Sequence, residues 1–343
     1  MLVLANILKN TPVSALITAK PIERKSFICL GDNDTIRSAL NIFITQEIDS
    51  IPIRNSFSKT IEFFGIITLP NLIKFVVKIK NDLSVSALLD MELAHVIKDV
   101  DLIKRVEFIS EQSSLLHILL NVWGENCNPK TTNIDCSHLI TTNDQGMHEI
   151  VTPLDFLRHI LFLSSSATAC IQTTSAAEIE NGFDVDKNFV ISWNDDAKFA
   201  FEKIINSEPV YLLAVVDEDS GALEANITIS DLLPSDETLL DEAISMMKRD
   251  GISIHAYLKT LKAAPISSID PILLYPHFTI YDLIEKLTRS KIHHLWRVTP
   301  DTKKIPIGAV GSSDILRYLS FMFRPFKQDS SDYKRECENL SLH

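Results

Sequence analysis

The feature that most constrains this chain is a strand–turn–helix segment that occurs four times. The last copy runs from Ile305 to Leu319. Its apolar stretch through Gly308 suits a short buried strand, and residues 311–314 (Gly-Ser-Ser-Asp) suit a helix start. Hydroxyl and carboxylate groups at a helix start accept hydrogen bonds from free N–H groups and complement the positive end of the dipole. A small anionic ligand is also held easily at such a place.

The three earlier copies have the same layout. Each places a hydroxyl residue three positions before an Asp or Asn, between an apolar strand and an apolar helix. They are Phe63–Ile73, Glu149–Leu157 and Ala225–Leu233. The Asp or Asn positions are 71, 155, 231 and 314, so successive copies are 84, 76 and 83 residues apart. Repeats of this size occupy nearly the whole chain and therefore decide the fold.

Around each copy the pattern predicts a strand, a helix, two strands and a closing helix. In the first unit, Ser26–Leu30 is the expected first strand, and Ile36, Ala39, Leu40 and Phe43 form the inward stripe of the helix. The predicted fold class is α/β, with α+β units at residues 10–78, 93–163, 168–234 and 262–323. The polar tail, residues 324–343, is expected to be disordered.

Two segments stand outside this repeat pattern. Residues 164–188 are rich in small polar residues, and the joint between two halves is expected there. Residues 237–262 predict an extra helix that ends near Gly251 and has no counterpart elsewhere in the chain.

Composition excludes several classes of protein. Apolar residues make up 45% of the 343 residues, which indicates a globular chain. The formal charge of −12 argues against a nucleic-acid partner, which would need clustered Lys and Arg. No apolar run reaches the roughly 18–20 residues of a membrane span, and residues 1–8 make a poor signal peptide. The five scattered cysteines fit reduced thiols, so a cytoplasmic or nuclear location is expected.

The repeated unit resembles a cystathionine-β-synthase (CBS) domain. Its end, Gly-h-h-Thr/Ser-x-x-Asp-h-h with h hydrophobic, is the family's motif, and Asp34–Leu40 is similar to the family's first helix start. Four tandem units resemble the gamma regulatory subunit of AMP-activated and sucrose-non-fermenting-related protein kinases, and related four-CBS regulators. Residues 291–295 with 307–316 are particularly similar to the last gamma repeat. The resemblance covers roughly residues 10–323.

The resemblance implies that the units pair into two Bateman modules, which pack into a disc and hold adenine nucleotides (AMP, ADP or ATP) in clefts. In that family the motif Asp takes the ribose hydroxyls, the Thr or Ser lies near the phosphate, and basic residues neutralise it. The implied nucleotide-binding residues here are Thr152, Asp155, Thr228, Asp231, His293, His294, Ser313 and Asp314, with Thr68 and Asn71 as a weakened version.

Departures from the family pattern restrict the expected sites. Asn71 replaces the ribose aspartate of unit 1, and Asp49 stands where a basic phosphate contact is expected. Unit 3 has residues 209–211 (Pro-Val-Tyr) at the equivalent place. In unit 4, His294 replaces the usual Arg, and Gly311 stands where a Ser or Thr is usual. Working sites are therefore expected only in units 2 and 4.

Simpler interpretations stay open. Each motif Asp is also a favoured first-turn helix residue without any ligand. Cys127, Cys136 and His138 could suggest a metal, but the spacing lacks the second pair of a zinc site and favours free thiols.

Three functional classes follow. The first is a non-catalytic regulatory subunit that senses adenine nucleotides and acts on protein kinase catalytic and scaffold subunits, or on a protein phosphatase. The second is a four-CBS scaffold that has lost nucleotide binding. The third, an enzyme, is disfavoured because the repeats use all the length and the sequence has no nucleotide-binding glycine loop, zinc-protease motif or catalytic triad.

Overall fold

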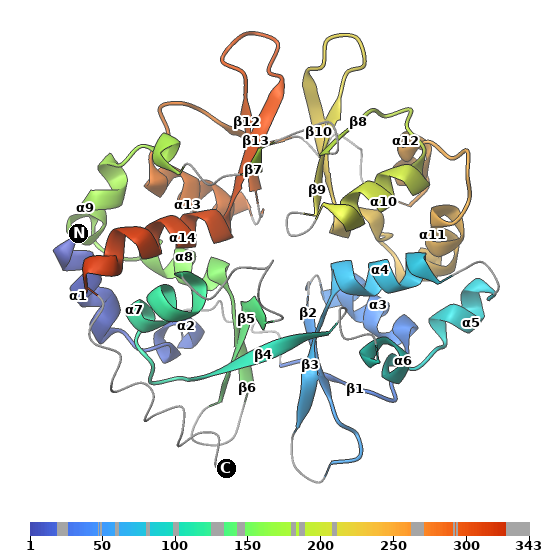
Figure 1. Ribbon diagram of the computed structural model, residues 1–343, viewed down its shortest axis with the longest axis horizontal. Helices are drawn as coiled ribbons and strands as arrows, with labels where there is room; N and C mark the ends of the chain where they lie inside the picture. Colours follow the sequence, from blue (N-terminus) through green and yellow to red (C-terminus); the bar gives the residue numbers. More distant parts are fainter. Residues whose placement is uncertain are drawn as a thin grey trace.

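Four units of similar architecture occupy the four quarters of the molecule, which Figure 1 shows down its shortest axis. This computed structural model describes residues 1–18, 27–46, 48, 50–58, 62–79, 83–98, 103–124, 134–142, 148–179, 183–184, 189–207, 211–261, 271–290, 292 and 294–326. Each unit has a strand, a helix, two more strands and a closing helix. The predicted α/β fold of four repeated units is confirmed.

The elements of the units follow one another in chain order. Unit 1 consists of β1 (Leu30–Gly31), α3 (Ile36–Gln46), β2 (Ser50–Arg54), β3 (Phe63–Thr68) and α4 (Leu69–Lys78). Unit 2 consists of β4 (Ile103–Ser110), α7 (Leu115–His117) with the π-helix η1 (Ile118–Gly124), β5 (Ile134–Thr142), β6 (His148–Val151) and α8 (Pro153–Leu161). Unit 3 consists of β8 (Val190–Ile191), α10 (Ala197–Asn206), β9 (Leu212–Val216), β10 (Leu223–Thr228) and the 3₁₀ helix η4 (Ile229–Leu232). Unit 4 consists of β11 (Leu273–Leu274), α13 (Ile280–Ser290), β12 (His294–Val298), β13 (Pro306–Gly311) and α14 (Ser312–Phe323).

Strand pairing has the same order in every unit. The first strand is parallel to the second, and the second is antiparallel to the third. The sheets of units 1 and 2 join edge to edge, because β3 and β4 pair antiparallel with Ile66 opposite Lys104. Units 3 and 4 meet instead through buried side chains, with Leu212 and Ala214 in one cluster with Trp296 and Ala309, and through one backbone hydrogen bond from the Leu223 N–H to Lys304 O at 3.1 Å. The strand β7 (Phe183–Asp184) adds to the edge of unit 4 beside β13.

Two hydrophobic cores each cross from the first half of the chain to the second. One core packs α3 and α4 of unit 1 with α10 of unit 3, and includes Leu72, Val76 and Phe201. The other packs α8 of unit 2 with α13 and α14 of unit 4, and includes Phe156 and Leu316. Because full burial of such a side chain contributes about 1.5–3 kcal/mol, the two halves stabilise each other substantially.

Short flanking helices cover the open side of each unit. Unit 1 receives α5 (Val85–Leu89) and α6 (Leu93–Ile97), and unit 2 receives α1 (Leu2–Asn10) and α2 (Ser14–Thr18). Unit 3 receives α11 (Leu240–Met247) and α12 (Ile254–Leu261), and unit 4 receives α9 (Ser165–Thr173) and η2 (Ala176–Glu178). The same isolated bridge docks them on each unit. The four bridges are Thr35–Glu92, Pro12–Ser114, Asp196–Ser253 and Ser175–Thr279.

These flanking helices correct one expectation and add detail to another. The segment 237–262 does have a counterpart, α5 with α6. Its single predicted helix is three elements, η5 (Glu237–Leu239), α11 and α12, because Gly251 takes φ +81° and breaks the chain direction between α11 and α12. The predicted joint at 164–188 contains a packed helix, α9, in which Ala167 and Ile171 are buried four residues apart. Because small polar residues occupy the other faces of α9, the sequence did not show this apolar stripe clearly.

The first predicted strand, Ser26–Leu30, is also wrong in extent. Among the described residues of that segment, 27–30, strand pairing begins at Leu30, and Leu30 and Gly31 pair with Ile53 and Arg54 at the edge of the sheet. Residues 327–343 of the predicted disordered tail lie outside the described residues, as do residues 125–133.

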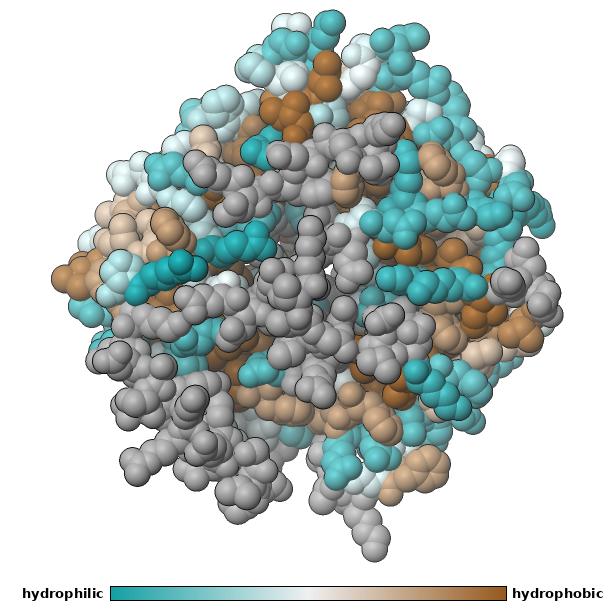
Figure 2. Space-filling model, viewed as in Figure 1, coloured by the Kyte–Doolittle hydropathy of each residue, from teal (hydrophilic) through white to brown (hydrophobic). Residues whose placement is uncertain are grey.

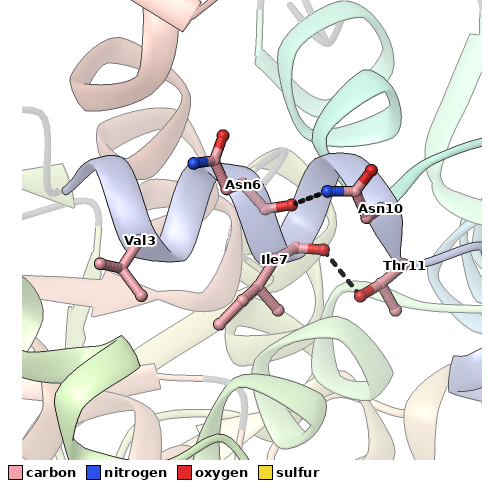
Figure 3. A pocket seen from close by; sticks show the side chains of 5 residues that line it. All are labelled: Val3, Asn6, Ile7, Asn10 and Thr11. Atoms are coloured by element: carbon pink, nitrogen blue, oxygen red, sulfur yellow. Dashed lines mark hydrogen bonds between the residues drawn. The ribbon is translucent and has the colours of Figure 1, made fainter.

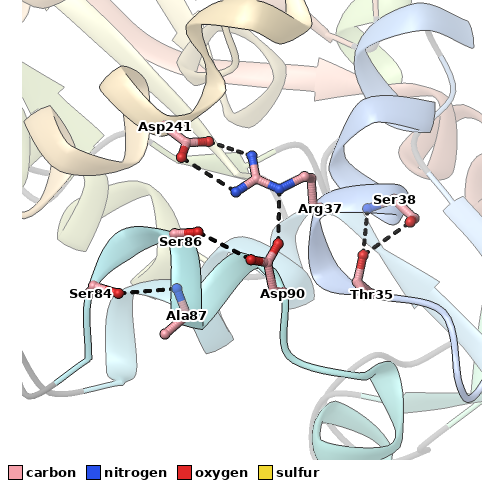
Figure 4. Close-up of polar contacts among 8 residues, drawn as sticks. All are labelled: Thr35, Arg37, Ser38, Ser84, Ser86, Ala87, Asp90 and Asp241. Carbon is pink, nitrogen blue, oxygen red and sulfur yellow. Dashed lines mark hydrogen bonds and ion pairs between the residues drawn. The ribbon is translucent and has the colours of Figure 1, made fainter.

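A cluster of charged side chains also connects the halves. Arg37 of α3 contacts Asp241 of α11 through both terminal nitrogens and Asp90 through Nε at 3.1 Å (Figure 4). Asp90 in turn accepts from Ser86 Oγ at 3.1 Å. This cluster lies between units 1 and 3.

No single helix in the described ranges combines the length and apolar character of a membrane span. The helices α8 and α9 together reach that length only as a pair bent by 113°.

Candidate functional site

A capping box forms the first turn of α8. The backbone N–H and Oγ1 of Thr152 both donate to Asp155 Oδ2 at 3.0 Å, and the Asp155 N–H donates to Thr152 Oγ1 at 3.4 Å. The local sequence favours this start, since Thr is a good N-cap residue and Pro153 fits the first helical position. The simpler interpretation, in which Asp155 only caps the first turn of the helix, therefore accounts for one of its carboxylate oxygens, Oδ2.

The helix α14 begins in the same way with glycine in place of threonine. The Gly311 N–H donates to Asp314 Oδ2 at 2.9 Å. Burial raises the pKa of Asp314, and the Gly311 amide and the nearby Arg317 and Arg297 oppose that rise. A carboxylate in such surroundings gains from each further hydrogen-bond donor that reaches it.

The three remaining predicted residues of unit 4 occupy different places in the structure. Since Gly311 is the N-cap of α14, Ser313 is in the first turn, is exposed and is not the structural equivalent of Thr152. His293 lies outside the described residues. His294 is partly buried at the start of β12.

Units 1 and 3 have weaker versions of the same arrangement. In unit 3, the Thr228 N–H and Oγ1 donate to Asp231 Oδ2 at 2.9 and 2.7 Å, but the closing helix is a 3₁₀ turn of four residues. In unit 1, Thr68 Oγ1 accepts from the Asn71 N–H at 3.4 Å, and Asn71 is buried and uncharged. Neither unit combines a motif carboxylate with a full closing helix.

Strand register identifies one residue, His138, that was not among the predicted site residues. His294 pairs directly with Gly311, the N-cap of α14. In unit 2, Leu139 pairs with Val151, so His138 stands opposite Thr152, the N-cap of α8. The same place is occupied by Ser50 in unit 1 and by Leu212 in unit 3. Units 2 and 4 alone therefore have a histidine opposite the helix start.

An arginine one turn further along completes the similarity of units 2 and 4. Arg158 Nη1 lies 3.5 Å from Asp155 Oδ1, and Arg317 Nη1 lies 3.5 Å from Asp314 Oδ1. The equivalent residues are Lys74 in unit 1 and Pro234 in unit 3. The signal was available in the sequence as a basic residue three positions after the motif Asp, but it was not used.

The helices that carry these groups pack in pairs. The closing helices α8 and α14 contact each other, and α4 contacts η4. In Figure 1, α4 and α14 start near the middle of the molecule and run outward to opposite sides. Hydrophilic side chains follow the exposed face of α14 in Figure 2, while hydrophobic atoms gather at the rim beside α1. The candidate groups of units 2 and 4 thus belong to one pair of packed helices.

An open groove beside α1 contains none of the predicted site residues. It is lined by Val3, Asn6, Ile7, Asn10 and Thr11 (Figure 3). The side-chain amide of Asn10 donates to Asn6 O at 2.8 Å and Thr11 Oγ1 to Ile7 O at 2.7 Å, so these two side chains bond to the backbone of α1. Among the described residues there is also no group of three or more His, Cys, Asp or Glu that could hold a metal ion.

Comparisons with known proteins agree with this architecture. The family model for the CBS domain matches residues 263–321. The solved structure of protein MJ1225 from Methanocaldococcus jannaschii, described as a proposed archaeal homologue of γ-AMPK, matches with a TM-score of 0.62 and 17% identity, over 90% of this chain and 100% of its own. At that identity the similarity shows the fold.

Other solved structures match less closely. An uncharacterised conserved protein from Pyrococcus horikoshii has a TM-score of 0.45 and 18% identity, over 79% of this chain and 91% of its own. The CBS domain of a bacterial CNNM/CorC family Mg²⁺ transporter in complex with ATP has a TM-score of 0.32 and 15% identity, over 46% of this chain and 92% of its own. The search of curated proteins finds no match.

Proposed function

Because the chain contains a CBS domain and has the fold of four CBS-like units, we propose that it is a non-catalytic regulatory subunit that senses adenine nucleotides. Units 2 and 4 provide the binding sites. The observation that carries this proposal is the threefold match between those units: a histidine opposite the helix start, an aspartate in the first turn and an arginine one turn later.

Each group has a role that fits its chemistry. Asp155 and Asp314 keep Oδ2 on the helix start and offer Oδ1 to ribose hydroxyls. His138, His294 and the positive ends of α8 and α14 face the place of a phosphate. Thr152 holds the N-cap in unit 2, whereas unit 4 uses the Gly311 amide in that place. Thr228 with Asp231, and Thr68 with Asn71, act as helix caps.

The packing of α8 against α14 connects nucleotide binding to the arrangement that a partner protein would contact. The helices α8 and α14 come from the two halves of the chain and share one core. A ligand that binds at their starts therefore stabilises one packing of the halves over another. A protein kinase complex, through its catalytic and scaffold subunits, or a protein phosphatase would respond if it binds those two packings with different affinity.

A second candidate function is a four-unit scaffold that no longer binds nucleotides. One observation favours it: the Oδ2 atoms of all three motif aspartates are already hydrogen-bonded within the chain. Such a protein would act through its surfaces alone.

Titration calorimetry with adenosine, AMP, ADP and ATP separates the two candidates. The sensor predicts saturable heat and a thermal shift, since a ligand at a hundred times its Kd stabilises the folded state by about 2.7 kcal/mol. If millimolar nucleotide produces neither heat of binding nor a thermal shift, the sensor function is excluded and the scaffold function remains.

A further inference from the structure

Arg158 and Arg317 have matching surroundings in two different units. Each stands three residues after a motif aspartate, with Nη1 at 3.5 Å from its Oδ1. The two carboxylate side chains are 12% and 16% exposed, whereas the two arginines are 30% and 41% exposed. Each pair thus combines a nearly buried acid with a cation that solvent can reach.

These ion pairs are long. Hydrogen bonds between an arginine and a carboxylate are usually about 2.7–2.9 Å, and 3.5 Å is at the outer limit. The carboxylate is already held through Oδ2 by the helix start. A guanidinium has five N–H donors, and within the described ranges each of these two has one hydrogen bond, to that carboxylate. Either arginine can therefore leave Oδ1 without breaking a strong interaction.

Helix geometry directs both side chains toward the same place. The Cα–Cβ bonds of an α-helix tilt toward its N-terminus, so Arg158 and Arg317 reach back over the first turn. That turn is the positive end of the helix, and His138 or His294 stands opposite it. An anion there would lie near the positive helix end and the arginine of the closing helix, and near a histidine from a strand of the same unit.

We propose that Arg158 and Arg317 decide whether the sites of units 2 and 4 take a phosphorylated or an unphosphorylated nucleoside. On binding, each Asp Oδ1 exchanges its arginine for a ribose hydroxyl, and the released arginine moves to the phosphate. This inference rests on the proposed function and names the residues that select the charged ligand.

Unit 1 supplies a matched control. Lys74 occupies the position of these arginines, three residues after Asn71, which has an amide where units 2 and 4 have a carboxylate. The substitution Lys74→Gln removes one positive charge at the same place in the repeat without altering units 2 and 4.

Calorimetric titration of adenosine and AMP tests the inference. Wild type is expected to prefer AMP. Arg158→Gln with Arg317→Gln should weaken AMP binding about tenfold or more, because a hydrogen bond to a charged group is lost, while adenosine binding does not weaken. Lys74→Gln should behave as wild type, and Arg158→Lys with Arg317→Lys should keep part of the preference.

Thermal unfolding without ligand shows whether the variants fold. Unchanged AMP affinity in the folded double Gln variant would overturn the inference, as would equal losses of AMP and adenosine, which would indicate a purely structural role. An equal loss of AMP affinity in Lys74→Gln would overturn it too, because the effect would then come from net charge. If wild type binds neither ligand, the proposed function itself fails and this inference falls with it.

Discussion

Arg37 of α3 and Asp241 of α11 form a bidentate ion pair that ties the first half of the chain to the second (Figure 4). At the other end of α11, Lys248 Nζ donates to Ile79 O at 3.4 Å, just after the end of α4. Arg37 from the first half and Lys248 from the second half thus hold α11 against unit 1. The hydrogen bonds that Arg37 donates to Asp241 and Asp90 raise its pKa, in keeping with a cation that both acids stabilise.

Reversing the charge of Arg37 tests that contact. Arg37→Glu should lower the free energy of unfolding by about 1 kcal/mol, since the pair is partly exposed and screened by solvent. The exchanged pair, Arg37→Asp with Asp241→Arg, should recover part of the loss in urea denaturation. The effect should shrink in 1 M salt, where charges are screened within about 3 Å. Full stability of Arg37→Glu at low salt would show that the pair contributes nothing.

A close approach between Gly124 of unit 2 and Ser320 of unit 4 predicts a steric effect. A Cβ on Gly124 would lie 1.9 Å from Ser320 Oγ and 2.7 Å from Ser320 Cβ, so η1 and α14 would have to separate. Gly124→Ala should therefore cost about 1–3 kcal/mol of stability. Adding Ser320→Gly should relieve the contact, so that the double variant loses less than the two single losses together. Additive losses would mean that the two residues do not meet.

His159 of α8 predicts a pH dependence. Its Nε2 is buried and has no hydrogen-bond partner among the described residues, and burial lowers its pKa from the ordinary 6.5. The folded chain therefore keeps this ring neutral while the unfolded chain takes up the proton. The stability it contributes is present above pH 6.5 and is lost as the pH falls below 6.5 through the folded pKa. Urea denaturation should be measured at pH 7.5 and at pH 5.5. Between these two pH values, the free energy of unfolding of His159→Gln should fall by less than that of wild type. Equal losses would place the pH dependence elsewhere, for example at His148, whose pKa burial also lowers.

Local features of the fold were predictable because they depend on near neighbours. Ile36, Ala39, Leu40 and Phe43 recur at helical spacing, and all four are buried on α3. Thr279 caps α13, with its N–H and Oγ1 donating to Asp282 Oδ2 at 2.8 Å. Because the same sequence pattern occurs four times, the fold predicted for one unit could be extended to all four.

Long-range packing was not predictable in the same way. Apolar faces such as those of Leu72 and Phe201 look alike in sequence, so nothing indicated that unit 1 would share its core with unit 3. The bridges that dock α6 and α12 also need the folded backbone, because a single hydrogen-bonded pair has no sequence pattern.

The candidate site was half predictable for a related reason. The motif itself indicated Asp155 and Asp314. The sequence alone does not give the strand register that places His138 opposite Thr152. In the sequence His138 stands out only beside Cys127 and Cys136, whose spacing favours free thiols over a metal site. Ser313 was chosen as the hydroxyl of unit 4 by its nearness to Asp314, whereas the cap is set by a three-residue spacing that selects Gly311.

The most direct test of the central claim is the number of AMP molecules bound per chain, measured by calorimetry in wild type and in Asp155→Ala with Asp314→Ala. Each substitution also removes a helix cap worth about 1 kcal/mol, so unfolding must be monitored alongside. Asp231→Ala is the matched control, because it removes the cap of a unit without the histidine and arginine. The account predicts about two bound AMP in wild type and in Asp231→Ala, and none in the folded double variant. Binding that persists in the double variant, or no binding in wild type, would contradict it.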